Sequence, residues 1–303
     1  MVGKVIEWFR KYFSKVKFHD KVLWKNYLSV VGVLSSIVTL LSFFATAQDL
    51  KINIWCVAIL FVIVLIAVFV RMWWGANQQN CAKLKINNTK IIVQEGDIFE
   101  LLEKEPANRE GEISIIGVND YYDVIVDNRI IAKASLHGKY IKRIVQAGKL
   151  ELLNEVIATD EILNKPGNGV ENHGRSKGKK IRYSIGSVVE FESYVLAAFT
   201  KFDENNKAFL SAEDYTGFWM RFWENIDEIY AGRTINIPLM GAGITRFRNG
   251  KPSKQELLET MLWTLKISGF HNTYGHKQIK IVIYKSDVED IDFYHIQHNS
   301  SFR

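Results

Sequence analysis

The sequence predicts an α/β domain of three layers that follows an N-terminal hairpin of two transmembrane helices. Two apolar runs of membrane-spanning length, residues 27–47 and 52–70, carry no formal charge. From residue 83 onward, short strand-like apolar runs alternate with amphipathic helical stretches. Such alternation is typical of a sheet that helices cover on both faces. We therefore expect a basic amphipathic segment at 1–26, the hairpin at 27–74 and a cytoplasmic domain at 83–303.

The two apolar runs are expected to form a tight hairpin. Only four residues separate them, and these include Asp49 and Lys51. The second run is followed by Arg71 and by two tryptophans, Trp73 and Trp74, which are typical anchors at a membrane interface. A cleaved signal peptide explains the pattern poorly, because each run is longer than a usual signal core and no small-residue cleavage site follows the pair.

The distribution of charge favours a membrane surface over a nucleic acid as the partner. The formal net charge of +6 lies within residues 1–82, and residues 1–26 alone hold seven basic and two acidic side chains. The rest of the chain holds 30 basic and 30 acidic side chains, which excludes the basic domain of a nucleic-acid binder. The excess of positive charge before the first span predicts that both termini lie in the cytoplasm.

The first 17 residues have the pattern of an amphipathic helix that lies in the membrane interface. Apolar side chains recur there at helical spacing, with lysines at positions between them. A basic flank without fixed structure is the alternative. The apolar positions are Val2, Val5, Ile6, Phe9, Phe13 and Val16.

The remaining chain supplies strands, helices and one long loop. A helix is expected over 136–158, and two capping boxes, at Ser211 and Ser253, open two further helices that stop at Gly232 and Gly269. The aromatic stripe of the first capped helix is expected in the core, because it has helical spacing. The strands are expected at 90–93, 113–118, 182–189, 194–202, 234–239 and 278–284.

The glycine-rich basic stretch 165–180 has no periodicity and is expected to be a solvated surface loop, with a ligand lid as the alternative.

The strongest chemical signal is a Gly-x-Gly turn, Gly241 to Gly243, directly after the strand at 234–239. Glycines at the carboxyl end of a strand let backbone N–H groups converge on an anion, and ligands of open α/β sheets bind at such ends. The pattern fits both a phosphate-binding loop and a tight turn that binds no ligand. The turn is neither a Walker loop, because no GK[ST] follows, nor a Rossmann fingerprint, because GxGxxG is absent.

Metal and covalent chemistry have little support. The four histidines near the C-terminus have no cysteine partner or closely set carboxylate pair. No Ser–His–Asp or Cys–His spacing stands out, and the two cysteines of the chain exclude a disulfide framework. We therefore expect no catalytic residues, no metal and no cofactor. The four histidines are His271, His276, His295 and His298.

Three further segments complete a recognisable set. Glu95-Gly96-Asp97-Ile98 follows the first expected strand, Gly117-Val118-Asn119-Asp120 follows the second, and Ser135 to Tyr140 opens a helix. Together with the Gly-x-Gly turn, these segments resemble the macro domain family, and residues 181–188 resemble that family's neighbouring central strand. The resemblance covers most of residues 85–285.

The resemblance implies a macro-type α/β/α domain that binds ADP-ribose. In the family, an Asp binds the adenine amino group, an Asn faces the distal ribose, and two loops wrap the diphosphate. The residues implied to bind ligand are Asp97, Ile98, Asn119, Asp120, Ser135, Leu136, His137, Gly138, Lys139, Gly241, Ala242, Gly243, Ile244 and Thr245. Arg246 and Phe247, which follow, are further candidates for phosphate contact or stacking, with a surface role as the alternative.

Two departures from the family pattern favour binding over catalysis. The usual Asn-Ala-Ala-Asn element is replaced by residues 118–122, Val-Asn-Asp-Tyr-Tyr, and the glycine run of the first diphosphate loop by residues 135–138, Ser-Leu-His-Gly. Hydrolytic members use those elements to position water. We therefore expect a ligand-binding protein that is not an enzyme.

With its hairpin, the chain resembles the membrane effectors of type II Thoeris anti-phage defence. That resemblance implies a TIR-domain NADase partner, which makes histidine-conjugated ADP-ribose as the signal. It also implies homo-oligomers in the bacterial inner membrane, which disrupt the bilayer and cause abortive infection. A membrane-tethered ADP-ribosyl hydrolase or phosphoesterase is one alternative, and an empty fold that tethers a partner protein is the other.

Overall fold

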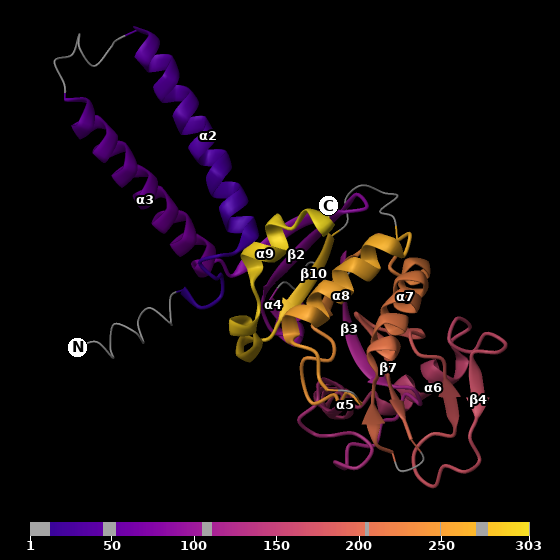
Figure 1. The fold of residues 1–303 in the computed structure, drawn as a ribbon. Coiled ribbons are helices and arrows are strands. Elements are labelled where there is room, and N and C mark those ends of the chain that lie inside the picture. The colour runs from indigo at the N-terminus through magenta and orange to yellow at the C-terminus, as the bar shows by residue number, and fades with distance from the viewer. Residues whose placement is uncertain are drawn as a thin grey trace, which may run out of the picture. The chain divides into compact units, whose positions relative to one another are not determined.

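The computed structural model describes residues 13–44, 53–104, 111–203, 206–248, 250–270 and 278–302 (Figure 1). The chain forms two compact units. The first contains residues 1–82 and Ile291–Ser300, and the second contains Lys83–Asp290 with the last three residues. Residues 291–300, which the sequence placed with the cytoplasmic domain, thus group with the hairpin.

The first unit is built on two long apolar helices, α2 (Lys21–Phe44) and α3 (Ile54–Gln78), which contact each other along a hairpin. Both are long and apolar enough to cross a membrane, and at most 6% of the apolar window of either helix is buried inside the chain. A core helix of a soluble domain would bury such a surface. Residues 27–44 and 54–70 of the two predicted runs fall in these helices, and residues 45–47 and 52 of the runs lie outside the described residues. Most of the predicted interfacial helix also lies outside the described residues.

The base of the hairpin is closed by an aromatic cluster and a buried amide. The Asn77 side chain accepts from the backbone N–H of Lys15 at 3.0 Å and of Val16 at 2.9 Å, and it donates to the Val16 carbonyl. The short helix α9 (Phe293–His298) joins this base, where the Tyr294 hydroxyl accepts from Asn26 Nδ2 at 2.7 Å. The buried members of the cluster are Val16, Leu23, Phe69, Trp73, Ala76 and Tyr294.

The second unit is an α/β domain around one eight-stranded sheet, in the order β1-β2-β10-β9-β3-β7-β6 with β8 paired to β7. The five strands β2, β10, β9, β3 and β7 are parallel, so their carboxyl ends lie at one edge of the sheet. The strands are β1 (Cys81–Ile86), β2 (Thr89–Glu95), β3 (Glu112–Asn119), β6 (Val188–Phe191), β7 (Tyr194–Phe202), β8 (Ala208–Phe209), β9 (Thr234–Pro238) and β10 (Gln278–Ile283).

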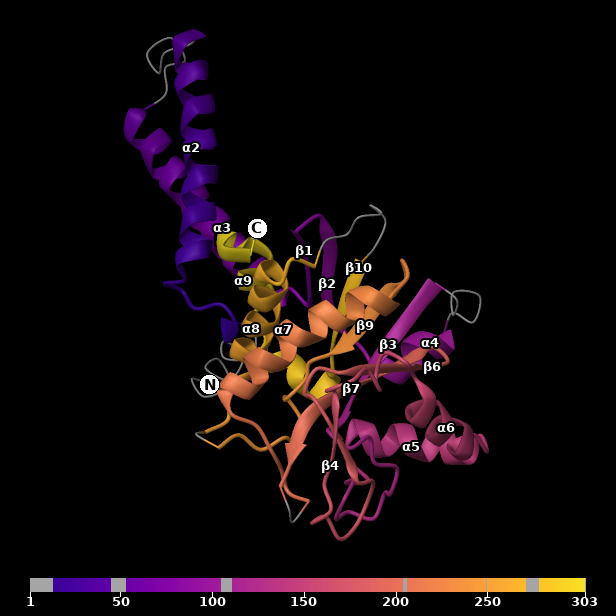
Figure 2. The ribbon, with the colours of Figure 1, turned by 90° about the vertical axis from the view of Figure 1, so that its right-hand side faces the viewer.

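Helices cover both faces of this sheet (Figure 2). On one side, α4 (Ile98–Lys104), α5 (Leu136–Gln146) and α6 (Leu150–Thr159) pack on β3 and β6. On the other side, α7 (Ala212–Ile229) packs against α8 (Lys254–Ile267). The predicted three-layer α/β domain is therefore confirmed.

Local sequence signals set the starts of α7 and α8. Both capping boxes form: Ser211 Oγ accepts from Asp214 N–H at 2.9 Å, and the Ser253 N–H donates to Glu256 Oε2 at 2.8 Å. The aromatic stripe of α7 is buried, and Trp219 and Trp223 stack with ring centroids 5.3 Å apart. The stripe is core, as predicted.

Two predicted elements are wrong as single units. The helix expected over 136–158 breaks into α5 and α6 at Gly148, whose φ of +69° turns the chain. The strand expected over 182–189 breaks at Gly186, with φ +89°, into β5 (Ile181–Tyr183) and β6. The parallel neighbours of β3 are β7 and β9, so residues 181–188 are not the central strand that the family resemblance implied.

The stretch 165–180 is also more ordered than predicted. Its β4 segment (Gly169–Glu171) pairs antiparallel with β5 in a separate two-stranded sheet. Arg175 within it is 1% exposed, and its guanidinium binds Asp123. The expectation of a wholly solvated loop is therefore wrong, because a buried ion pair fastens the middle of the stretch to the domain.

Candidate functional site

A cavity of about 700 Å³ lies at the carboxyl ends of β3, β7 and β9. Gly117, Phe199 and Thr200 from two of these strands line it, and Pro238, Leu239 and Met240 line it at the end of the third. The volume is in the range of sites for small molecules. A side chain at Gly117 would press against the Met240 sulfur, with its Cβ 2.8 Å away, so the glycine leaves room for the Met240 side chain, which follows β9.

One wall of the cavity is the β9 loop, residues 239–245. Gly241 has φ +83°, a conformation that only glycine adopts without strain. Within the described residues, the backbone N–H groups of Gly243, Ile244 and Thr245 donate to no protein acceptor, and all three residues line the cavity. Successive free N–H groups that face one space form an anion-binding concavity.

The N-terminus of α5 forms a second wall. Ser135 caps the helix by accepting from Gly138 N–H at 3.0 Å, and Leu136 and His137 of the first turn line the cavity. The first N–H groups of a helix carry a partial positive charge. Gly138 itself is required by packing, since a Cβ there would collide with the Ala132 carbonyl oxygen. Two backbone elements that can bind an anion, the β9 loop and the N-terminus of α5, therefore line the same cavity.

The charged side chains around the cavity have a single sign. Arg129, Lys177, Lys207 and Arg246 line it, and none of its described lining residues is acidic. Only Arg246 was a candidate from the sequence. The other three come from loops without a motif, and no local pattern signals that they meet at the same strand ends.

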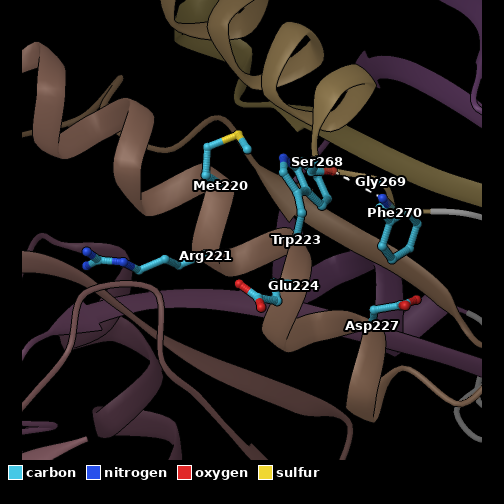
Figure 3. Close-up of a pocket in the computed structure, with 8 residues that line it drawn as sticks. All are labelled: Met220, Arg221, Trp223, Glu224, Asp227, Ser268, Gly269 and Phe270. Atoms are coloured by element: carbon cyan, nitrogen blue, oxygen red, sulfur yellow. Dashed lines mark hydrogen bonds between the residues drawn. The ribbon is translucent and has the colours of Figure 1, made fainter.

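A second cavity, of about 390 Å³, is poorly suited to an anion (Figure 3). It lies between α7 and the segment after α8, where Ser268, Gly269 and Phe270 meet the helix. The C-terminus of a helix carries a partial negative charge, and the two carboxylates of Glu224 and Asp227 outnumber the guanidinium of Arg221 in the described lining. The cavity at the strand ends is therefore the candidate site for an anionic ligand.

Two of the expected ligand residues are used inside the protein. Asn119 Nδ2 donates to Asp123 Oδ2 at 3.0 Å, and its Oδ1 accepts from two backbone N–H groups. Asp120 accepts from Arg182 Nε at 2.7 Å and from the Phe202 N–H at 3.1 Å. Burial raises the pKa of Asp120, against the opposing effect of Arg182. Both side chains are buried outside the cavity lining, and their ligand contacts stay predictions.

Comparison with known proteins agrees with this geometry. The family model described as "Thoeris protein ThsA, Macro domain" matches residues 91–284. The chain belongs to this family. A curated relative, Thoeris protein ThsA of Bacillus amyloliquefaciens (strain Y2), is 32% identical over 285 residues, which is 93% of this chain and 91% of the relative.

Solved structures of the Oceanobacillus iheyensis macrodomain are also similar. One is a mutant, with 16% identity and a TM-score of 0.40, and the match covers 72% of this chain and 96% of that chain. Another has MES bound, with 14% identity and a TM-score of 0.35 over 72% of this chain and 94% of that chain.

In this ThsA macro domain, half of the expected binding residues line the cavity and half do not. Those that line it are Ser135, Leu136, His137, Gly241, Gly243, Ile244 and Thr245. Those outside the lining are Asp97, Ile98, Asn119, Asp120, Gly138, Lys139 and Ala242. Ile98 is a core residue of the domain, 4% exposed.

The sheet edge beyond the cavity adds an aromatic ring and a carboxylate. Asp97 follows β2, and Tyr284 follows β10, whose last residues pair in parallel register with those of β2. Asp97 Oδ1 accepts from the Phe99 N–H at 2.9 Å. Tyr284 is half exposed, and Lys139 Nζ lies 5.6 Å from its ring centroid. An accessible aromatic face at this edge fits a purine base.

His137 is a neutral member of the site. Burial lowers its pKa to about 3, although a hydrogen bond to the Asp123 backbone raises it in part. An uncharged imidazole can offer hydrogen bonds to a hydroxyl group but adds no charge at neutral pH.

Replacement of His137 by glutamine is expected to remove part of the acid sensitivity of folding. The folded-state pKa lies below the unfolded value of 6.5, so the unfolded chain takes up this proton first. The histidine therefore costs no stability above pH 6.5, and it destabilises the fold increasingly below that pH, by about 2 kcal/mol at pH 5. Urea denaturation of both proteins between pH 4 and 8 measures this. A stability difference that is independent of pH would contradict the prediction.

Proposed function

We propose that this protein is a membrane-anchored effector of anti-phage defence, whose macro domain binds an ADP-ribose-type nucleotide. The observation that carries the proposal concerns the described residues: β9-loop N–H groups without a protein acceptor meet the α5 N-terminus at one cavity, and no acidic side chain among these residues lines it. Both elements offer N–H donors to an anion. A diphosphate bound between the β9 loop and the N-terminus of α5 would accept hydrogen bonds from the N–H groups of both.

The order of strands along the sheet supports an orientation for the nucleotide. With the diphosphate at the end of β9, the adenine lies toward β10 and β2, where Tyr284 and Asp97 follow the strands. The distal ribose then lies toward Gly117 of β3 and Phe199 of β7, which line the cavity. His137 lines the same cavity.

The basic side chains around the cavity support a finer proposal for the ligand. The proposed signal is histidine-conjugated ADP-ribose made by a TIR-domain NADase. Arg129, Lys177 and Lys207 line the cavity, and no acidic residue of the described chain lines it beside them, which supports a ligand with an additional carboxylate. Binding without hydrolysis is proposed because the carboxylate of Asp120 and the amide of Asn119 make their hydrogen bonds within the protein.

The proposed response is self-assembly of the hairpins in the inner membrane, with both termini in the cytoplasm. Two spans per chain cannot enclose a wide pore, so bilayer disruption requires several copies. Assembly requires only that the signal bind the assembled state more tightly. A preference of about 3 kcal/mol shifts the equilibrium by more than a hundredfold.

The test uses the full chain reconstituted in dye-filled liposomes. ADP-ribose, NAD and histidine-linked ADP-ribose are titrated, and binding, dye release and ligand integrity are measured in parallel. We expect the histidine conjugate to bind most tightly, to remain intact and to release dye. Sealed liposomes at saturating conjugate would refute the effector, and steady conversion of the ligand would identify a hydrolase instead.

A further inference from the structure

Lys251, which precedes α8, and Lys254, the first residue of α8, make different contacts. Lys251 Nζ donates to the carbonyl oxygens of Ala242 and Gly243, both at 2.6 Å. Lys254 Nζ binds Asp287 Oδ1 at 2.7 Å and Asp290 Oδ2 at 2.8 Å, in the short helix η2 (Lys285–Asp290). Only the first lysine therefore holds the backbone of the loop that lines the cavity.

The bonds of Lys251 fix the direction of two backbone donors. In a trans peptide, the C=O of one residue and the N–H of the next lie in one plane and point in opposite directions. The Ala242 carbonyl shares its peptide plane with the Gly243 N–H, and the Gly243 carbonyl shares its plane with the Ile244 N–H. Because one ammonium holds both carbonyls, both N–H groups point away from Lys251. Within the described chain these N–H groups have no protein acceptor.

We infer that Lys251 is a positioning residue for diphosphate binding, which orients the N–H groups of Gly243 and Ile244 without touching the ligand. This inference rests on the proposed function. The lysine also satisfies two loop carbonyls that would otherwise need water. Donors that are held in place before binding save the entropy of ordering the loop when the ligand arrives.

The electrostatic surroundings of Lys251 fit this role. Partial burial lowers its pKa, as does the nearby Lys254, whereas Asp287 opposes the shift. Two carbonyl oxygens are its hydrogen-bond acceptors, and neither belongs to a carboxylate. Among the described residues, the Lys251 ammonium is therefore engaged in charge-assisted hydrogen bonds to loop carbonyls rather than in an ion pair.

The experiment measures ADP-ribose binding by calorimetry to the full chain in detergent, at 0.1 M and 1 M salt. Lys251→Met is expected to weaken ADP-ribose about tenfold at both salt concentrations, because it removes hydrogen bonds to the loop rather than an ion pair with the ligand. Lys251→Arg, which can donate to both carbonyls, is expected to recover most of the affinity. Lys254→Met is the matched control and is expected to bind within twofold of wild type.

Adenosine, which lacks the diphosphate, separates positioning from loss of the fold. Its affinity is expected to be unchanged in Lys251→Met, and an equal loss for adenosine would overturn the inference. A loss for ADP-ribose that disappears at 1 M salt would also overturn it, since it would indicate direct charge contact with the ligand. Wild-type affinity in Lys251→Met would refute the inference alone, whereas a wild-type chain that does not bind ADP-ribose would refute the proposed function as well.

Discussion

Replacing Gly243 by glutamate is expected to weaken binding of ADP-ribose-type nucleotides by at least about a hundredfold while the domain stays folded. A Cβ at this position meets no atom within 4 Å, and the φ angle of Gly243 is not positive. A side chain therefore causes no backbone strain there. We expect the new carboxylate to lie beside the loop N–H groups, which have no protein acceptor among the described residues. At an effective dielectric constant of 20, two unit charges 4 Å apart repel by about 4 kcal/mol, which exceeds the hundredfold effect.

Gly243→Gln is the matched control for this substitution, because it adds nearly the same volume without the charge. We expect it to lose about tenfold or less, and we expect both variants to melt within a few degrees of wild type. Calorimetry and thermal denaturation of the full chain measure the two quantities. Equal affinities for the glutamate and glutamine variants would show that no anion binds at this loop.

The same pair of variants tests whether binding causes membrane damage. If the signal drives assembly, the glutamate variant should leave liposomes sealed at concentrations that release dye with the glutamine variant. Dye release by the glutamate variant without nucleotide binding would separate the membrane activity from this site.

Residues whose role depends on local geometry were accessible from the sequence. The Gly-x-Gly turn follows a run of strand type, and the capping serines stand directly before amphipathic helices, so each signal spans only a few residues. The strand before the Gly-x-Gly turn indicated which edge of the sheet holds the site. The resemblance to the macro domain family, and not a local signal, implied that the start of α5 lies at the same site, and both elements line the cavity. The position of the candidate site was therefore predictable.

Contacts between residues far apart in the sequence could not be predicted from such local signals. Arg175 lies in a stretch that is rich in glycine and charge, and its partner Asp123 is 52 residues earlier. Nothing local shows that this arginine is buried while its neighbour Lys177 lines the cavity. The turn at Gly186 was missed because its apolar flanks have strand character, whereas the turn itself depends on the approach of α7: a Cβ there would lie 2.7 Å from Arg221 Cβ.

Replacing Arg175 by methionine is expected to destabilise the macro domain by about 3–5 kcal/mol, the range for breaking a buried ion pair. The side chains of Arg175 and Asp123 are both fully buried, with a bidentate pair at 3.1 and 2.6 Å. The guanidinium also donates to Asn206 Oδ1 at 2.8 Å and lies 3.8 Å from the Tyr121 ring centroid. Without the arginine, the carboxylate of Asp123 loses its bidentate ion-pair partner and stays buried.

Urea denaturation of the full chain measures this effect, with Lys149→Met as a control. Lys149 pairs with Glu192 at the surface, where both side chains are more than 40% exposed, and such pairs contribute at most about 1 kcal/mol. Arg175→Lys should rescue little, because a lysine cannot reproduce the bidentate geometry.

The double variant Arg175→Met with Asp123→Leu identifies the source of the loss. If an unpaired buried carboxylate causes most of it, removing that carboxylate should recover part of the stability, and the double variant should lose clearly less than the sum of the two single losses. Losses that simply add would mean that the two side chains act independently. Because Arg175 also binds Asn206, which lines the cavity, a stable double variant is still expected to bind nucleotide more weakly than wild type. The stability of the fold and the position of Asn206 in the cavity lining thus depend on the same buried arginine.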